Sequence, residues 1–141
     1  MAPACALDFD PTSEIPSLSG KTILVTGGTA GLGRETILAF AAHEPAQLIF
    51  TGRSQASADK LIEEVKERFP RTPIVFESCD LASLAKVQQA AKNILGKINR
   101  LDIVMFNAGV MALPPSVTKD GEFGDGYNAF RRNANTSVLR T

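Results

Sequence analysis

The sequence is poor in the residues that build metal centres and disulfide frameworks. Its 141 residues contain no tryptophan, one tyrosine, one histidine and two cysteines. A structural zinc site needs about four Cys or His ligands, so the composition excludes one. Cys5 and Cys79 stand far apart and form no Cys-x-x-Cys pair, which is typical of free thiols in a reducing compartment.

A strong charge of either sign is also absent. Fifteen Lys and Arg residues balance fifteen Asp and Glu residues, which excludes the basic footprint of a general nucleic-acid binder. No apolar run approaches the ~20 residues that span a bilayer. The acidic N-terminus lacks the basic region of a secretory signal. We therefore expect a cytoplasmic protein that binds neither nucleic acid nor membranes.

A regular alternation of apolar runs and amphipathic segments begins at residue 21. The apolar runs, which predict strands, are Thr22–Thr26, Gln47–Gly52, Pro73–Glu77 and Asp102–Asn107. Their lack of polar alternation is typical of parallel strands that are covered on both faces. Helical spacing of apolar residues fills each interval between them. The pattern predicts an α/β fold, a Rossmann-type doubly wound parallel sheet truncated after about four strands.

The two ends of the chain do not share this alternation. Residues 1–20 are rich in Pro and Ser and predict a leader that is loose until it meets the first strand. Residues 114–141 contain several glycines but no clear helical stripe. We expect an irregular tail whose sequence is foreign to the rest of the chain. In a sheet ordered third, second, first, fourth, the strand around Ile103–Phe106 lies at an edge. Self-association through that exposed edge is therefore expected.

A glycine-rich turn between the first expected strand and the first expected helix is the most informative feature. Its members are Gly27, Gly28, Thr29, Ala30, Gly31, Leu32 and Gly33. Glycine permits positive φ and brings bare backbone close to a ligand. The following helix presents free N–H groups and its positive dipole end, which suit a pyrophosphate. The position within a βα series favours a nucleotide site over a tight structural turn.

The spacing of Gly27, Gly31 and Gly33 resembles that of the short-chain dehydrogenase/reductase superfamily. Three further motifs agree in order and place: Thr51-Gly52-Arg53-Ser54, Cys79-Asp80-Leu81 and Asn107-Ala108-Gly109. Residues 107–115 look most like the retinol-dehydrogenase-like reductases. The resemblance covers residues 21–113 and implies the N-terminal, coenzyme-binding half of an NAD(P)-dependent oxidoreductase that acts on a carbonyl or alcohol substrate.

The resemblance also implies a role for each matching residue. Gly27, Gly31 and Gly33 would shape the pyrophosphate turn, while Gly28, Thr29, Ala30 and Leu32 would supply its surface. Asp80 would accept a hydrogen bond from the adenine amino group, with Leu81 beside it. Asn107, Ala108 and Gly109 would stabilise the sheet and pass under the adenine ribose. Considered alone, Asp80 is better explained as a helix N-cap for the segment from Ala82, and it is the company of the other motifs that favours the adenine contact.

Coenzyme choice depends on the end of the second strand. Enzymes that use NAD place Asp or Glu there to bind the ribose 2′-hydroxyl, whereas a basic residue accommodates a 2′-phosphate. Here Arg53 and then Ser54 follow the strand, and no acid appears before Asp59. Because a guanidinium can bind phosphate through two hydrogen bonds, the sequence predicts NADP (NADPH) rather than NAD. The alternative is a solvated arginine at a helix start.

The catalytic pair of the superfamily, a Tyr and a Lys four residues apart, is not found. The single tyrosine, Tyr127, is followed four residues later by Arg131, so we assign no catalytic residue. Two functions therefore stay open. One is the coenzyme-binding half of an NADP(H)-dependent oxidoreductase, and the other is a non-catalytic nucleotide-binding or regulatory module that needs a partner chain.

Overall fold

Strands and helices alternate along the described part of the chain. The computed structural model of the protein describes residues 9–109 and residue 121. The elements are β1 (Thr22–Thr26), α1 (Gly31–Ala41), β2 (Gln47–Gly52), α2 (Gln55–Arg68), β3 (Ile74–Ser78), α3 (Leu84–Leu95) and β4 (Ile103–Phe106). Cys5, Tyr127 and nearly all of the predicted tail lie outside the described residues. Within those residues, no helix is both long and apolar enough to cross a membrane.

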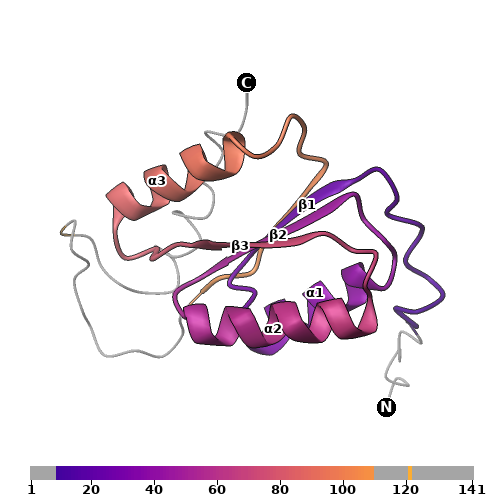
Figure 1. Cartoon of the computed structure of the whole chain (residues 1–141). Helices are drawn as coiled ribbons and strands as arrows, with labels where there is room; N and C mark the ends of the chain where they lie inside the picture. The colour runs from indigo at the N-terminus through magenta and orange to yellow at the C-terminus, as the bar shows by residue number, and fades with distance from the viewer. Residues whose placement is uncertain (1–8, 110–120, 122–141) are drawn as a thin grey trace, which may run out of the picture.

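The four strands form one parallel sheet in the order β3-β2-β1-β4. Helices α1 and α2 cover one face and α3 lies over the other (Figure 1). The predicted α/β fold class and strand order are therefore confirmed. β3 begins at Ile74, one residue later than predicted, because Pro73 has no N–H group to donate to the sheet.

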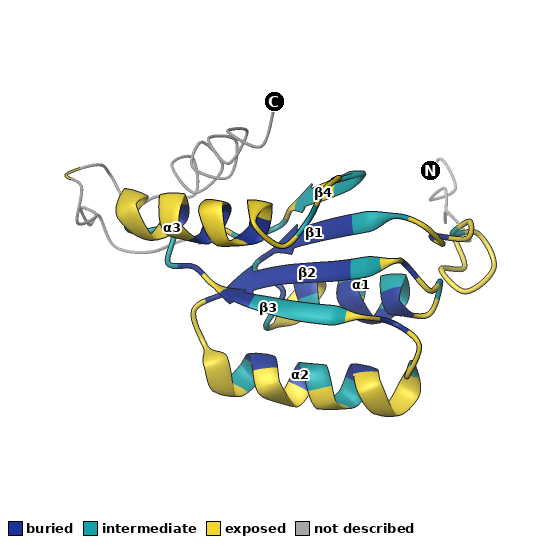
Figure 2. Ribbon diagram, turned by 45° about the horizontal axis from the view of Figure 1, so that its top comes forward, coloured by how far each residue is buried: buried dark blue, intermediate teal, exposed yellow. Residues whose placement is uncertain are grey.

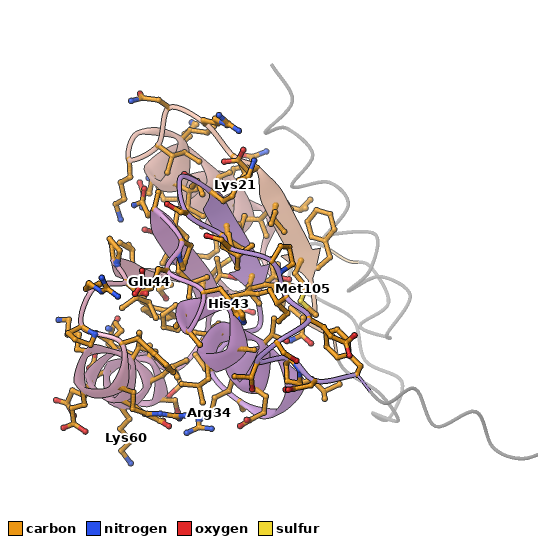
Figure 3. The ribbon with its side chains drawn as sticks, turned by 90° about the vertical axis from the view of Figure 1, so that its right-hand side faces the viewer. Lys21, Arg34, His43, Glu44, Lys60 and Met105 are labelled. Carbon is orange, nitrogen blue, oxygen red and sulfur yellow. The ribbon has the colours of Figure 1, made fainter. Side chains whose placement is uncertain are left out.

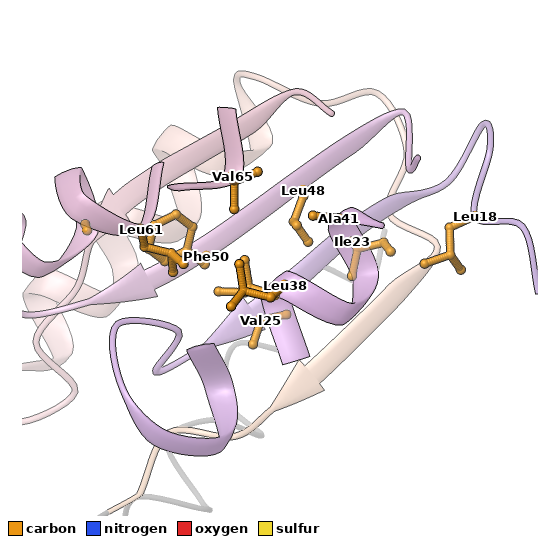
Figure 4. Close-up of a cluster of buried hydrophobic side chains, with 11 residues drawn as sticks. Leu18, Ile23, Val25, Leu38, Ala41, Leu48, Phe50, Leu61 and Val65 are labelled. Carbon is orange, nitrogen blue, oxygen red and sulfur yellow. The ribbon is translucent and has the colours of Figure 1, made fainter. Parts of the chain in front are cut away.

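The larger core lies between the sheet and the pair α1 and α2. Alternate residues of the central strands point to this face, and Phe50 packs against Phe76 with ring centroids 5.1 Å apart. Figure 4 shows this cluster, whose labelled members are Leu18, Ile23, Val25, Leu38, Ala41, Leu48, Phe50, Leu61 and Val65. Full burial of large aliphatic side chains stabilises such a core by ~1.5–3 kcal/mol each. This face therefore fixes β1 and β2, the strands whose ends carry the candidate site.

The α3 face is less completely covered. Helix α3 packs its buried residues against the centre of the sheet, where Ile94 contacts Leu24 and Ile49. Val104, which pairs in register with Leu24, is 38% exposed, and Phe106 is 42% exposed. The teal and yellow colouring of β4 in Figure 2 shows the same contrast with the buried central strands. In the described part of the chain, β4 is thus an edge strand with apolar residues in solvent.

The second half of the leader packs onto the fold, contrary to the expectation that it is loose up to the first strand. Leu18 is only 6% exposed and belongs to the larger core, with Ile15 packed beside it. The Leu18 N–H donates to the His43 carbonyl at 3.1 Å, and His43 Nε2 lies 2.8 Å from the Pro11 carbonyl oxygen. These apolar and backbone contacts hold the stretch from Pro11 to Leu18 against the fold, and they give His43 a structural role.

Asp102 joins the beginning of β4 to the beginning of β1. Its Oδ2 accepts a hydrogen bond from the Thr22 N–H at 2.9 Å, and its own N–H donates to the Thr22 carbonyl at 2.9 Å. The Thr22 N–H lowers the pKa of the Asp102 carboxyl. Burial partly opposes this shift, and Arg100 and the charge of Lys21 reinforce it. The carboxylate form therefore stabilises the fold.

We expect Asp102→Asn to lower the thermal midpoint at pH 7 and to have little effect in acid. A carboxyl whose pKa is lowered in the folded state contributes its full stabilisation above the ordinary value of 3.8. That contribution is lost as the pH falls through the lowered folded value. Melting curves between pH 7 and pH 2.5 measure the difference, and Asp59→Asn, on the exposed face of α2, is the charge-matched control. An Asp102→Asn deficit that stayed constant across this range would contradict the assignment.

Candidate functional site

The glycine-rich turn lies where the carboxyl ends of β1 and β2 meet. Gly27 has a φ of +69° and ends β1 with a backbone conformation that side-chain-bearing residues rarely adopt. The N–H of Gly28 donates to the Thr51 carbonyl at 3.0 Å and so attaches the turn to β2. The chain then enters α1 at Gly31. Crevices at the carboxyl ends of parallel strands are the usual ligand sites of such sheets.

Helix α1 begins so close to β1 that Gly33 has no room for a side chain. A Cβ atom on Gly33 would lie 2.3 Å from the Gly27 carbonyl oxygen and 2.5 Å from Asn107 Nδ2. Both distances are far below van der Waals contact. Glycine at this position therefore lets the first turn of the helix rest on the end of the strand.

The N-terminus of α1 is left open for an anion. Ala30, the N-cap residue, makes no side-chain hydrogen bond, and the first turn contains no acidic residue. The first N–H groups of a helix lack intrahelical partners, and the helix dipole gives them partial positive charge. Among the described residues, a Cβ atom on Gly31 would meet nothing within 4 Å, and Leu32 is 80% exposed. Open space therefore adjoins these N–H groups.

The end of β4 is attached directly to the glycine turn. Asn107 Nδ2 donates to the Gly27 carbonyl at 3.1 Å, and the Ala108 N–H donates to Thr26 Oγ1 at 3.1 Å. Gly109 follows and is exposed. The sequence did not predict a site role for the Thr26 side chain. A threonine at the end of an apolar run gives no sign that it will contact a residue 82 positions away. These bonds hold β4 and the turn in one fixed arrangement.

Two arginines lie near the turn and differ in their surroundings. Arg34, which is labelled in Figure 3, lies in the first turns of α1. It forms ion pairs with Glu35 and with Glu64 of α2. Arg53, directly after β2, is exposed and makes no hydrogen bond or ion pair with any described residue. Ser54 beside it uses its hydroxyl to accept from the Ser57 N–H at 3.2 Å and so caps α2. Of these two arginines, Arg53 is thus the one that no described residue pairs and that is available to an added anion.

Asp80 lies at the end of β3, but it is not the N-cap of α3. Its Oδ1 accepts from the Ala82 N–H at 3.0 Å in a short turn, and Ser83 is the N-cap residue. Its Oδ2 has no partner among the described residues. Beside it a small apolar hollow opens between α3 and the strand ends, lined by residues that include Thr26, Thr51, Cys79 and Leu81. Asp80 Oδ2 can accept a hydrogen bond from an added amine, whereas the hollow, at about 10 Å³, has room for no more than a water molecule.

Cys79 is the one thiol in the described region, and its surroundings make it unreactive. It is 7% exposed. Burial, reinforced by the negative charges of Asp80 and Glu77, raises the pKa of the thiol to about 11. The thiolate is the nucleophilic form, so Cys79 is neutral near pH 7 and serves as a small buried residue.

Comparison with known proteins agrees with this geometry. The family described as short chain dehydrogenase matches residues 21–138. The chain belongs to the short-chain dehydrogenase family. This confirms the resemblance that the motifs carry. The matched range includes most of residues 114–141, which counts against the expectation that this tail is foreign to the family.

Curated members of the family are about two fifths identical to this chain over the residues that align. A short-chain dehydrogenase/reductase of Armillaria gallica is 40% identical over 110 residues, which are 77% of this chain and 35% of that protein. The WW domain-containing oxidoreductase of Drosophila melanogaster is 38% identical over 106 residues, 74% of this chain and 26% of that protein. The chain thus spans about a quarter to a third of the length of these relatives.

Solved structures have the same fold. A mutant of the Serratia marcescens short-chain dehydrogenase/reductase superposes with a TM-score of 0.70 at 22% identity and covers 89% of this chain and 52% of that one. A blue fluorescent protein from a metagenomic library, in complex with NADPH, gives a TM-score of 0.64 at 26% identity and covers 87% of this chain and 50% of that one. Nicotinamide dinucleotides are the coenzymes of this family.

We expect Gly31→Val to weaken dinucleotide binding by at least about tenfold, which corresponds to ~1.4 kcal/mol. The valine would occupy the open space beside the α1 N–H groups, and its φ of +54° would add backbone strain. Gly20→Val is the matched control, because Gly20 has a φ of +76°, equally open surroundings and a place outside the turn. Fluorescence titration with a reduced dinucleotide measures both variants. If Gly31→Val and Gly20→Val bound the dinucleotide equally well, the glycine turn would have only a structural role.

Proposed function

We propose that this chain is the coenzyme-binding part of an NADP(H)-dependent oxidoreductase that acts on a carbonyl or alcohol substrate. The observation that carries the proposal is the unpaired Arg53 beside an open glycine turn, with no acid at the end of β2. A carboxylate there would accept the ribose 2′-hydroxyl of NAD, whereas a guanidinium suits the 2′-phosphate of NADP.

The residues present fit the adenine and pyrophosphate parts of such a coenzyme. The pyrophosphate would lie over the N–H groups of α1, where no acidic side chain repels it. The adenine would lie outside the hollow, against Leu81 beyond the end of β3, with Asp80 Oδ2 accepting from its amino group. Asn107 and Ala108 hold the turn from below. The bound nicotinamide would supply or accept the hydride.

Two structural neighbours support the choice of coenzyme. The metagenomic blue fluorescent protein has NADPH bound, and so does a Sphingobium yanoikuyae short-chain dehydrogenase, which has 22% identity and a TM-score of 0.64 over 85% of this chain and 48% of that one. The second likeness is one of fold alone. Both are consistent with NADP(H) in this chain, and the argument from Arg53 is independent of them.

We expect Arg53→Ala to lower NADPH affinity by roughly ten- to a hundredfold and to leave NADH affinity nearly unchanged. Loss of a charge-assisted hydrogen bond, ~1.5–3 kcal/mol, corresponds to this range. Parallel titrations with NADPH and NADH give the ratio of dissociation constants. Arg34→Ala removes the same charge from an arginine already paired with Glu64, so it should leave the ratio unchanged. Equal affinity of the unaltered chain for both coenzymes would overturn the NADP assignment.

We further propose that the 141-residue chain binds coenzyme without turning it over. Its one tyrosine, Tyr127, has Arg131 four residues on, and the proton donor of the reaction needs a group placed and tuned for that task. A positioned general acid alone accelerates such a reaction by ~10²–10⁴-fold.

Turnover is tested with the purified chain, NADPH and a panel of aldehydes and ketones. We expect NADPH absorbance to stay constant and Tyr127→Phe to change nothing. If the absorbance falls steadily with the unaltered chain and the fall stops with Tyr127→Phe, then the tail does contain a catalytic tyrosine. Activity that appears only on mixing with a second chain would favour a regulatory module with a partner.

A further inference from the structure

Two buried threonines lie side by side on the α3 face of the sheet. Thr26 of β1 pairs in register with Thr51 of β2, and the two residues are 2% and 6% exposed. Both line the small hollow under α3, together with Cys79, Leu81 and apolar residues of the helix. Because adjacent strands lie only ~4.8 Å apart, the two threonine side chains border the same small space.

The protein groups of the described region leave both hydroxyls incompletely bonded. Thr26 Oγ1 accepts from the Ala108 N–H at 3.1 Å, but its own proton has no acceptor among the described residues. The Thr51 hydroxyl makes no hydrogen bond with any of those residues. Buried hydroxyls normally have a partner, since leaving one without a partner costs its desolvation free energy. The two hydroxyls therefore require a partner from outside the described chain.

The charged residue in the same row of the sheet does not supply that partner. Glu77 of β3 pairs in register with Thr51 on the side away from β1. One of its carboxylate oxygens accepts from Asn93 at 2.6 Å, and the other accepts from Lys97 at 2.9 Å. The Glu77 carboxylate is thus bound to the last turn of α3 and to the turn that follows, and it is not part of the lining of the hollow.

The hollow has the size of a site for one water molecule. Its volume is about 10 Å³, and roughly 10–15 Å³ is enough for one water but not for a larger ligand. A water with two hydrogen bonds of ~2.8 Å spans up to ~5.6 Å, which covers the separation of paired residues on adjacent strands. The Cys79 sulfur, a weak donor and acceptor, borders the same space and gives the water a third neighbour.

We propose that the hollow between α3 and the carboxyl ends of β1 and β2 is a binding site for one buried water, which bridges the hydroxyls of Thr26 and Thr51. The water accepts the Thr26 proton and donates to Thr51 Oγ1. Through Thr26 it also links β2 to Ala108 at the end of β4. The inference does not rest on the proposed coenzyme function, because the adenine would lie outside the hollow.

The water is tested directly by crystal structures, at a resolution that shows ordered water, of the unaltered chain and of Thr51→Val. Valine has nearly the shape of threonine and lacks only the hydroxyl. We expect one water within hydrogen-bond distance of both hydroxyls in the unaltered chain, and none in the variant. An empty hollow in the unaltered chain, a water that contacts only one of the two hydroxyls, or a water that persists in Thr51→Val would overturn the proposal.

The direction of the stability change gives a second, independent test. We expect Thr51→Val to lower the melting midpoint by roughly 2–5 °C, as for one lost hydrogen bond. The matched control is Thr72→Val, because Thr72 is 5% exposed and its hydroxyl donates directly to the Ala41 carbonyl at 2.9 Å. Its midpoint should fall by a similar amount.

A hydroxyl that has no partner gives the opposite result. Its replacement by a methyl group removes an unsatisfied buried polar group and leaves the midpoint unchanged or raised. Such a result for Thr51→Val, with a lowered midpoint for Thr72→Val, would overturn the bridging water. Should Thr51→Val not fold, the crystal structure of the unaltered chain decides alone, by the presence or absence of a water bonded to both hydroxyls.

Discussion

The direct contact between the first turn of α1 and the end of β1 determines the arrangement of the whole site. It requires glycine at position 33, where any side chain would collide with the Gly27 carbonyl and the Asn107 amide. Because of that contact, the free N–H groups at the start of α1 lie at the carboxyl edge of the sheet. The same amide of Asn107 binds the Gly27 carbonyl and so fixes β4 against the turn. A ligand that bridges the ends of β1, β2 and β4 thus meets a preformed backbone.

Charge is distributed around this edge in a way that favours one kind of ligand. The arginine inside α1 is neutralised by Glu35 and Glu64, whereas the arginine after β2 has no partner in the described chain. No acid occupies the first turn of α1. A polyanion with a second phosphate near β2 therefore meets no acid in the first turn of α1 and an unpaired arginine directly after β2. Membership of the short-chain dehydrogenase family supplies the class of that polyanion, a nicotinamide dinucleotide.

Much of the fold was predictable, because buried parallel strands leave a simple signal. Uninterrupted apolar runs located β1, β2, β3 and β4 to within a residue or two, and the βα spacing set the topology. The packing of Leu18 escaped prediction, because an isolated leucine in a Pro- and Ser-rich stretch has no periodicity. Leu84 and Leu95 fit the helical stripe of α3 but are 36% and 45% exposed, since spacing does not tell how far a helix overlies the sheet.

The candidate site was predictable where function imposes a local motif, and not where distant residues meet. The glycine spacing and Arg53 could be read directly from short stretches. The bond between Thr26 and Ala108 and the pairing of Thr26 with Thr51 beside the hollow join residues far apart in the chain. Neither residue type is unusual at its position, so only the folded arrangement shows what they do.

The central claim is that NADPH binds along the carboxyl edge of this sheet. Titrating the isotope-labelled chain with NADPH and following its backbone amide resonances tests this most directly. The account predicts saturable shifts concentrated at residues 27–33, at Arg53 and at residues 80–81, with the opposite ends of the strands, near Thr22 and Gln47, unaffected. Shifts that are absent, or that gather away from the glycine turn, would contradict it.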